Sequence, residues 1–90
     1  MTFQQIAQEL KVDPKILEHD SLKTYFKHEL KIVEAQLFSL ATKYGIKTIE
    51  EFNRAVEQGK FREKETFEDY FAYDNLEAQK KRFLRILESL

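Results

Sequence analysis

The sequence predicts an all-α fold: an antiparallel helical hairpin or small bundle with two long helices, a short cross-helix and an N-terminal helical segment. Residues that favour helices (Glu, Lys, Leu, Ala and Gln) recur throughout the 90 positions, with only two glycines and one proline. Apolar residues return at intervals of three and four, as they do on one face of a helix. The alternation typical of strands is missing. On length we expect one domain over residues 1–90.

The N-terminal helical segment is predicted for residues 1–20. Thr2 is a suitable cap for a first helix over residues 3–10. Asp13-Pro14 marks a second helix start, because Asp caps helices and Pro suits the first helical position. Asp20-Ser21 offers a further cap, although a helix that starts at Pro14 can also continue through it.

The first long helix is predicted over residues 21–45. Its apolar residues form one stripe with steps of four and three: Leu22, Phe26, Leu30, Val33, Leu37, Leu40 and Tyr44. Gly45 is expected to end this helix, because glycine readily adopts the left-handed conformation found just after helices.

A short helix and a second long helix complete the expected hairpin. Thr48 and Glu51 have the spacing of a capping box and predict the short helix within residues 48–59. After a charged connection over residues 60–65, Thr66 is expected to cap the last helix, 66–90. Short connections favour antiparallel packing. We expect the first 20 residues to fold back over the open end of the hairpin.

Composition excludes several classes of function. Fifteen basic and sixteen acidic residues nearly cancel, so the overall charge indicates neither a nucleic-acid nor a membrane binder. Without cysteine there is no thiolate chemistry and no cysteine-ligated zinc. No apolar run approaches the ~20 residues of a membrane span, and the N-terminus has no secretory signal pattern. The expected location is the cytoplasm.

Catalytic and cofactor motifs are also missing from the sequence. His19 and His28 have no histidine partner at helical spacing, and Glu18-His19-Asp20 would point in three directions. Gly45 and Gly59 each mark a helix end rather than a phosphate-binding loop. We therefore expect no enzymatic activity, no cofactor and no metal.

The apolar residues exceed one stripe per helix. Eight phenylalanines and four tyrosines are many for 90 residues. The N-terminal segment and the short helix provide one possible cover. We favour the alternative that part of this surface binds another chain, since large exposed apolar patches usually mark interaction sites. The candidate contact residues are Tyr25, Ile32 and Phe38 on one face and Phe67, Tyr70 and Phe71 on another.

Antiparallel packing would also gather basic residues at one end. This expected basic patch contains Lys23, Lys27, Lys31, Lys80, Lys81, Arg82 and Arg85. Acidic residues gather at the other end. Ordinary solvated faces are the explanation that we favour for this pattern; the functional alternative is docking of an acidic protein, RNA or DNA. Nucleic acid is the weaker candidate, because no aromatic residue is clearly interleaved for base stacking.

Residues 3–19 offer a separate hypothesis, a degenerate helix-turn-helix. Ala7 and Val12 occupy the small and apolar positions of such a motif, but Lys11 stands where the turn usually carries glycine. The would-be recognition helix, 14–19, has Lys15 as its only cation. A DNA-binding regulator is therefore an alternative reading.

Several short pieces carry a resemblance: Asp13-Pro14-Lys15-Ile16-Leu17, Ser21-Leu22, Lys43-Tyr44-Gly45-Ile46, Glu50-Glu51-Phe52, Gly59 and Phe67-Glu68-Asp69-Tyr70. With these pieces the chain is similar to small uncharacterised prokaryotic all-helical proteins, which resemble the antitoxin-like partners of toxin–antitoxin pairs. The resemblance implies an antitoxin-like inhibitor or accessory protein and assigns no site residue.

Taken together, these observations favour a non-catalytic protein–protein interaction module whose partner is another protein or a second copy. The alternatives are a structural homodimer of unknown role and the DNA-binding regulator.

Overall fold

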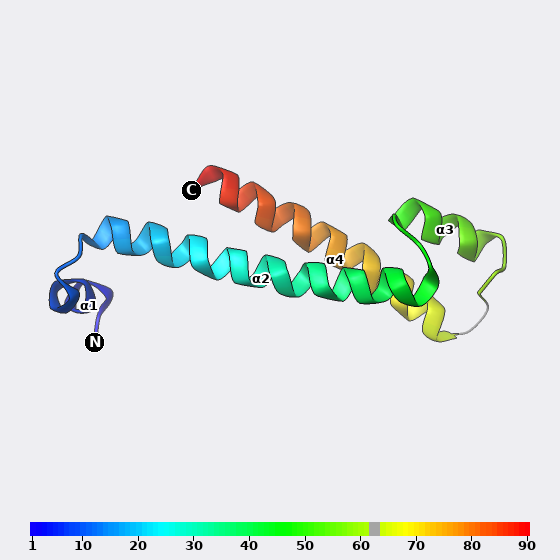
Figure 1. The fold of residues 1–90 in the computed structure, drawn as a ribbon, viewed down its shortest axis with the longest axis horizontal. Helices are drawn as coiled ribbons and strands as arrows, with labels where there is room; N and C mark the ends of the chain where they lie inside the picture. The colour runs from blue at the N-terminus through cyan, green and yellow to red at the C-terminus, as the bar shows by residue number, and fades with distance from the viewer. Residues whose placement is uncertain (62–63) are drawn as a thin grey trace.

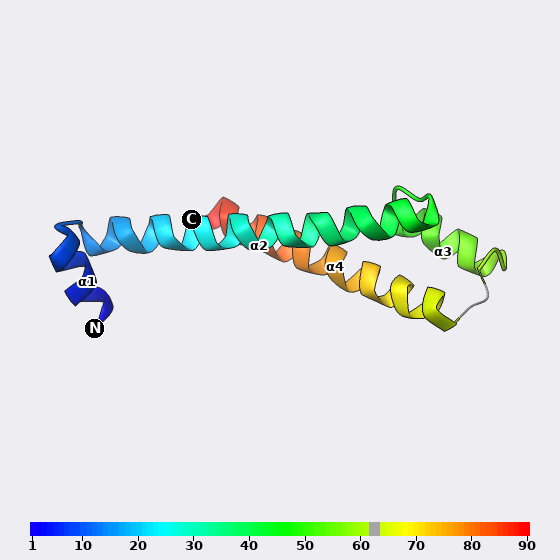
Figure 2. The same ribbon diagram turned by 60° about the horizontal axis from the view of Figure 1, so that its bottom comes forward.

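Four helices make up the described part of the chain, residues 1–61 and 64–90 of a computed structural model. They are α1 (Phe3–Leu10), α2 (Pro14–Tyr44), α3 (Ile49–Glu57) and α4 (Lys64–Ser89). No strand occurs in these ranges, so the predicted all-α fold is confirmed. α2 and α4 lie antiparallel, α3 packs at the closed end of this hairpin, and α1 lies at the far end (Figures 1 and 2). The molecule is a rod of 60 × 23 × 16 Å.

α1 is fixed by a reciprocal cap. The Thr2 hydroxyl accepts a hydrogen bond from the Gln5 backbone N–H at 3.2 Å, and the Gln5 side chain accepts one from the Thr2 N–H at 2.8 Å. The helix ends at Leu10, and Lys11, which follows it, has a φ of 57°. Lysine thus takes the left-handed conformation that glycine adopts at lower cost.

α2 is a single helix of 31 residues. Asp13 caps it by accepting a hydrogen bond from the Lys15 N–H at 2.8 Å, and Pro14 is its first residue, as the sequence predicts. The boundary expected at residues 20 and 21 is wrong, because the helix runs through Asp20-Ser21. A cap residue is useful only where free N–H groups need a partner, and here the preceding turn already supplies carbonyl partners.

The two ends of α3 follow the prediction closely, with one difference. Gly45 closes α2 at a φ of 64°, and Thr48 caps α3 by accepting from the Glu51 N–H at 3.1 Å. The Glu51 carboxylate, however, accepts from the Lys47 N–H at 2.9 Å, one residue before the cap. The capping box is therefore half formed. α3 ends at Glu57, and Gly59 follows at a φ of 71°.

α4 starts earlier than expected. Thr66 was expected to cap it, but the helix already includes Lys64, and Thr66 is buried with 3% exposure. Lys64 and Glu65 are good helix formers and extend the first turn toward the N-terminus. Of the predicted charged connection, Arg62 and Glu63 lie outside the described residues.

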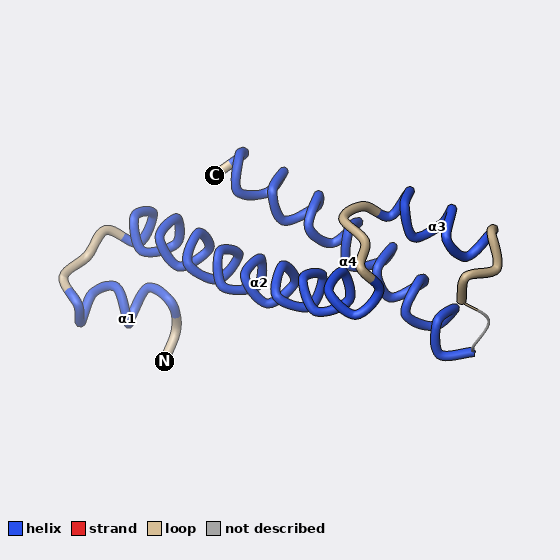
Figure 3. The backbone as a smooth tube through the Cα atoms, turned by 45° about the vertical axis from the view of Figure 1, so that its right-hand side comes forward, coloured by secondary structure: helices blue, strands red, loops and turns tan. Residues whose placement is uncertain are grey.

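The core sits at the closed end, where α3 stands beside the first half of α4 (Figure 3). Its buried members are Val33, Leu37, Ile46, Phe52 and Tyr73. The Phe52 ring lies 4.7 Å from the Tyr44 ring and 6.1 Å from the Tyr73 ring, measured between centroids. This aromatic cluster joins α2, α3 and α4.

α1 does not cover the open end of the hairpin, contrary to the expectation for the first 20 residues. It packs against α2, and Figure 1 shows it beyond the point where α4 ends. Only residues 11–13 connect α1 to α2, which is too short a turn to carry α1 across to α4. Leu22 and Leu90 consequently stay exposed.

Candidate protein-binding surface

Tyr25 and Ile32 lie on one exposed face of α2. They are seven residues apart, which returns to nearly the same side of a helix. Tyr25 is 57% exposed, and its ring packs edge-on against Phe26 at 5.1 Å. Phe26 in turn contacts Phe83 of α4 at 5.8 Å. Tyr25 therefore stands at the edge of the α2–α4 seam and presents its outer side to solvent.

Phe38 does not share the face of Tyr25 and Ile32, although the three were grouped on one face. Six residues separate it from Ile32, which places it about 120° around the helix. It is 73% exposed and borders a hollow of about 320 Å³ with Tyr73, Glu77 and Lys80. Phe38 is thus a separate exposed aromatic residue on the opposite side of the seam.

The three aromatic residues proposed on α4 also divide. Phe67 and Phe71 are one turn apart and exposed, Phe71 at 62%. Tyr70 turns inward: its ring lies 5.5 Å from Phe52, and its hydroxyl donates to the Asn53 side-chain oxygen at 3.2 Å. Tyr70 therefore serves mainly to hold α3 on α4, and Phe67 and Phe71 form the exposed pair.

The basic residues gather near one end, because α2 and α4 are antiparallel. The contact between Phe26 and Phe83 sets the register of the two helices at this end. It places the part of α2 with Lys23 and Lys27 beside the part of α4 with Arg82 and Arg85. Lys80 is half-buried and borders the hollow beside Phe38. The other six basic side chains are exposed.

At the closed end, a polar cluster that sequence reasoning missed joins α2 to α4. The Lys43 ammonium lies 2.6 Å from Glu65 Oε1 and 2.8 Å from Asp69 Oδ2, and the Tyr44 hydroxyl donates to Asp69 Oδ2 at 2.5 Å. Hydrogen bonds from Lys43 and Tyr44 lower the pKa of Asp69. The hydrogen bonds that Lys43 donates to Asp69 and Glu65 raise the pKa of Lys43. Burial raises the pKa of Tyr44. In the sequence, only the predicted antiparallel hairpin indicated that residues of the two long helices would meet here.

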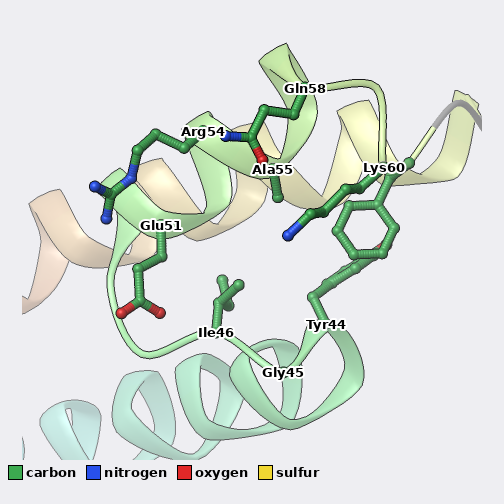
Figure 4. A pocket seen from close by; sticks show the side chains of 9 residues that line it. Tyr44, Gly45, Ile46, Glu51, Arg54, Ala55, Gln58 and Lys60 are labelled. Carbon is green, nitrogen blue, oxygen red and sulfur yellow. The ribbon is translucent and has the colours of Figure 1, made fainter.

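A hollow of about 380 Å³ lies between α3 and the end of α2 (Figure 4). Ile46 and Lys60 point into it, whereas Arg54 extends away from it. The Glu51 carboxylate at its edge is held by the Lys47 N–H. Among the described residues that line this space there is no Ser, Cys or His. Within residues 1–61 and 64–90, no three His, Cys, Asp or Glu residues gather as metal ligands would.

The proposed helix-turn-helix has its two helices and its turn. Lys11 supplies the left-handed turn residue, and α2 begins at Pro14. The second helix is not a short recognition helix, however, but the first turns of α2. Its charges are mixed, with Glu18 and Asp20 close to Lys15. The motif therefore lacks a concentrated positive potential for phosphates.

None of the described helices is long and apolar enough to cross a membrane. No curated protein and no solved structure matches the chain. A family model does match, over residues 1–90, and its description reads Uncharacterized protein MJ0235 family.

Proposed function

The chain belongs to the uncharacterized MJ0235 family, and from its surface we propose that it is a non-catalytic module that binds another protein chain. The supporting observation is the exposure of large apolar side chains on well-packed helices. Phe38 and Phe71 lie mostly in solvent although a polar residue at either position would serve the helix equally well. Apolar helix faces of this kind are used to bind partner helices and grooves.

An antitoxin-like inhibitor is one version of this proposal. The match to the MJ0235 family supplies no link to toxin–antitoxin pairs. We therefore propose only that the surface binds a protein chain, and the experiment below identifies the partner.

The test is affinity capture of the tagged chain from its native cells, followed by identification of bound proteins. The double variant Phe38→Ser/Phe71→Ser removes the two most exposed aromatic side chains of the hairpin. We expect a partner in stoichiometric amounts with the natural chain, depleted at least tenfold with the variant. Glu50→Ser, an exposed polar position on α3, is the control and retains the partner. Equal recovery from all three, or no partner at all, refutes the proposal.

DNA binding through residues 3–19 is tested separately. A regulator of this kind would bind duplex DNA at low salt and lose affinity steeply as salt rises, because phosphate contacts release counterions. The mixed charge of this segment leads us to expect no binding to a duplex at low salt. A salt-sensitive complex that Lys11→Ala and Lys15→Ala weaken would favour the regulator instead.

A further inference from the structure

We propose that the protein forms an antiparallel two-fold dimer in which the N-terminal arm of each copy lies on the basic hairpin end of the other. The N-terminal arm is residues 3–20, and the basic hairpin end comprises residues 21–31 and 78–90. This inference goes beyond the proposed function, because the arm and the basic hairpin end do not include Phe38 and Phe71. It follows from shape, apolar exposure and charge.

The first observation is the surface area of the single chain. A compact monomer of 10.8 kDa exposes about 5,500 Å². This chain exposes 7042 Å². Its radius of gyration is 18.9 Å, whereas a compact domain of this length has about 12 Å. The difference in area is about 1,500 Å² for each copy, or about 3,000 Å² for a pair, which is within the range of permanent dimer interfaces.

The second observation is where apolar side chains are exposed. The arm extends beyond the end of α4 (Figure 1), and although α1 packs against α2, several of its apolar residues stay uncovered. Leu10 and Ile16 are 58% and 56% exposed. The same region also exposes Phe3, Ile6 and Val12. A stretch of this length with so many open apolar side chains is what a second chain covers in a dimer.

The third observation is complementary charge. In residues 1–20, four carboxylates (Glu9, Asp13, Glu18 and Asp20) outnumber two lysines. In the basic hairpin end, seven Lys and Arg residues outnumber two carboxylates. An antiparallel pairing places the acidic arm of one copy on the basic end of the other, twice by symmetry. A parallel pairing would place like charges together.

The test uses sedimentation equilibrium of the full-length chain and a charge exchange. The natural chain is expected to sediment at twice 10.8 kDa. Variant A, Glu9→Lys/Glu18→Lys, gives the arm a net positive charge; variant B, Lys81→Glu/Arg82→Glu/Arg85→Glu, gives the hairpin end a net negative charge. Each alone repels its own copy, so we expect at least a tenfold weaker dimer. Mixing A with B restores attraction in both contacts, and we expect the dimer to return.

The control reverses two charges at the closed end, as variant A does in the arm, in Glu50→Lys/Glu68→Lys, and leaves the dimer intact. All these positions are exposed, and circular dichroism checks that each variant is folded. A natural chain that stays monomeric, or variants A and B that dimerise unchanged or fail to recover on mixing, overturns the inference. A monomer that captures a foreign protein through Phe38 and Phe71 refutes only the dimer, whereas a monomer that captures nothing refutes the proposed function too.

Discussion

Phe52 is the residue on which the closed end of the hairpin depends, and Phe52→Ala tests that packing directly. Its side chain is fully buried, with the rings of Tyr44, Tyr70 and Tyr73 within 6.1 Å. Truncating a buried Phe to Ala removes its transfer free energy and leaves a cavity, which together cost about 4 kcal/mol. A chain of 90 residues has a total unfolding free energy of about 9 kcal/mol. The substitution should therefore remove nearly half of the stability.

The assay is urea unfolding followed by circular dichroism, with all variants at one protein concentration because an associating chain gains stability by mass action. Phe71→Ala is the matched control: it removes the same ring from an exposed position and should change the unfolding free energy by less than about 0.5 kcal/mol. A loss below about 1 kcal/mol for Phe52→Ala would contradict the packing of α3 on the hairpin.

Three further changes probe the polar cluster and two of the left-handed positions. Asp69→Asn removes a carboxylate that accepts from Lys43 and Tyr44, and should lower the unfolding free energy by about 1 kcal/mol at neutral pH. Because folding lowers the pKa of Asp69, its contribution is present above the unfolded value of 3.8 and is lost as the pH falls through the folded value. Urea unfolding across this acid range should show the natural chain and the variant converging, and a constant gap would be evidence against it. Gly45→Ala meets no atom within 4 Å, so its cost of about 1 kcal/mol comes from the φ of +64° alone and should lower the melting temperature by about 5 °C. Lys11→Gly places glycine where lysine now has a positive φ, which removes backbone strain and should slow amide exchange in α1. An unchanged exchange rate would mean that Lys11 is not strained.

Local signals in the sequence predict most of the helix boundaries. Asp13-Pro14, Gly45 and Thr48 each act within a few residues, and the structure uses them as predicted. Asp20-Ser21 carries the same type of signal and is overridden, because α2 already starts at Pro14 and its first turns supply carbonyl partners for the N–H groups that follow. A cap residue makes a helix start favourable at its position, but the structure around it decides whether a helix starts there.

The candidate surface is less predictable than the fold. The exposure of Phe38 and Phe71 follows from their positions outside the main stripes. The contacts of Tyr70 and Lys43 were harder to predict, because their partners Asn53 and Asp69 are 17 and 26 residues away in the sequence. Such pairs depend on the register between helices, and capping or periodicity within one helix does not set that register.

The uninterrupted length of α2 has a mechanical consequence. The helix spans about 46 Å at 1.5 Å per residue, and after Pro14 it contains neither glycine nor proline. The residues with positive φ nearest to it, Lys11 and Gly45, lie in the turns at its two ends and not within it. α2 therefore acts as a stiff rod that keeps α1 and the aromatic cluster around Phe52 a fixed distance apart.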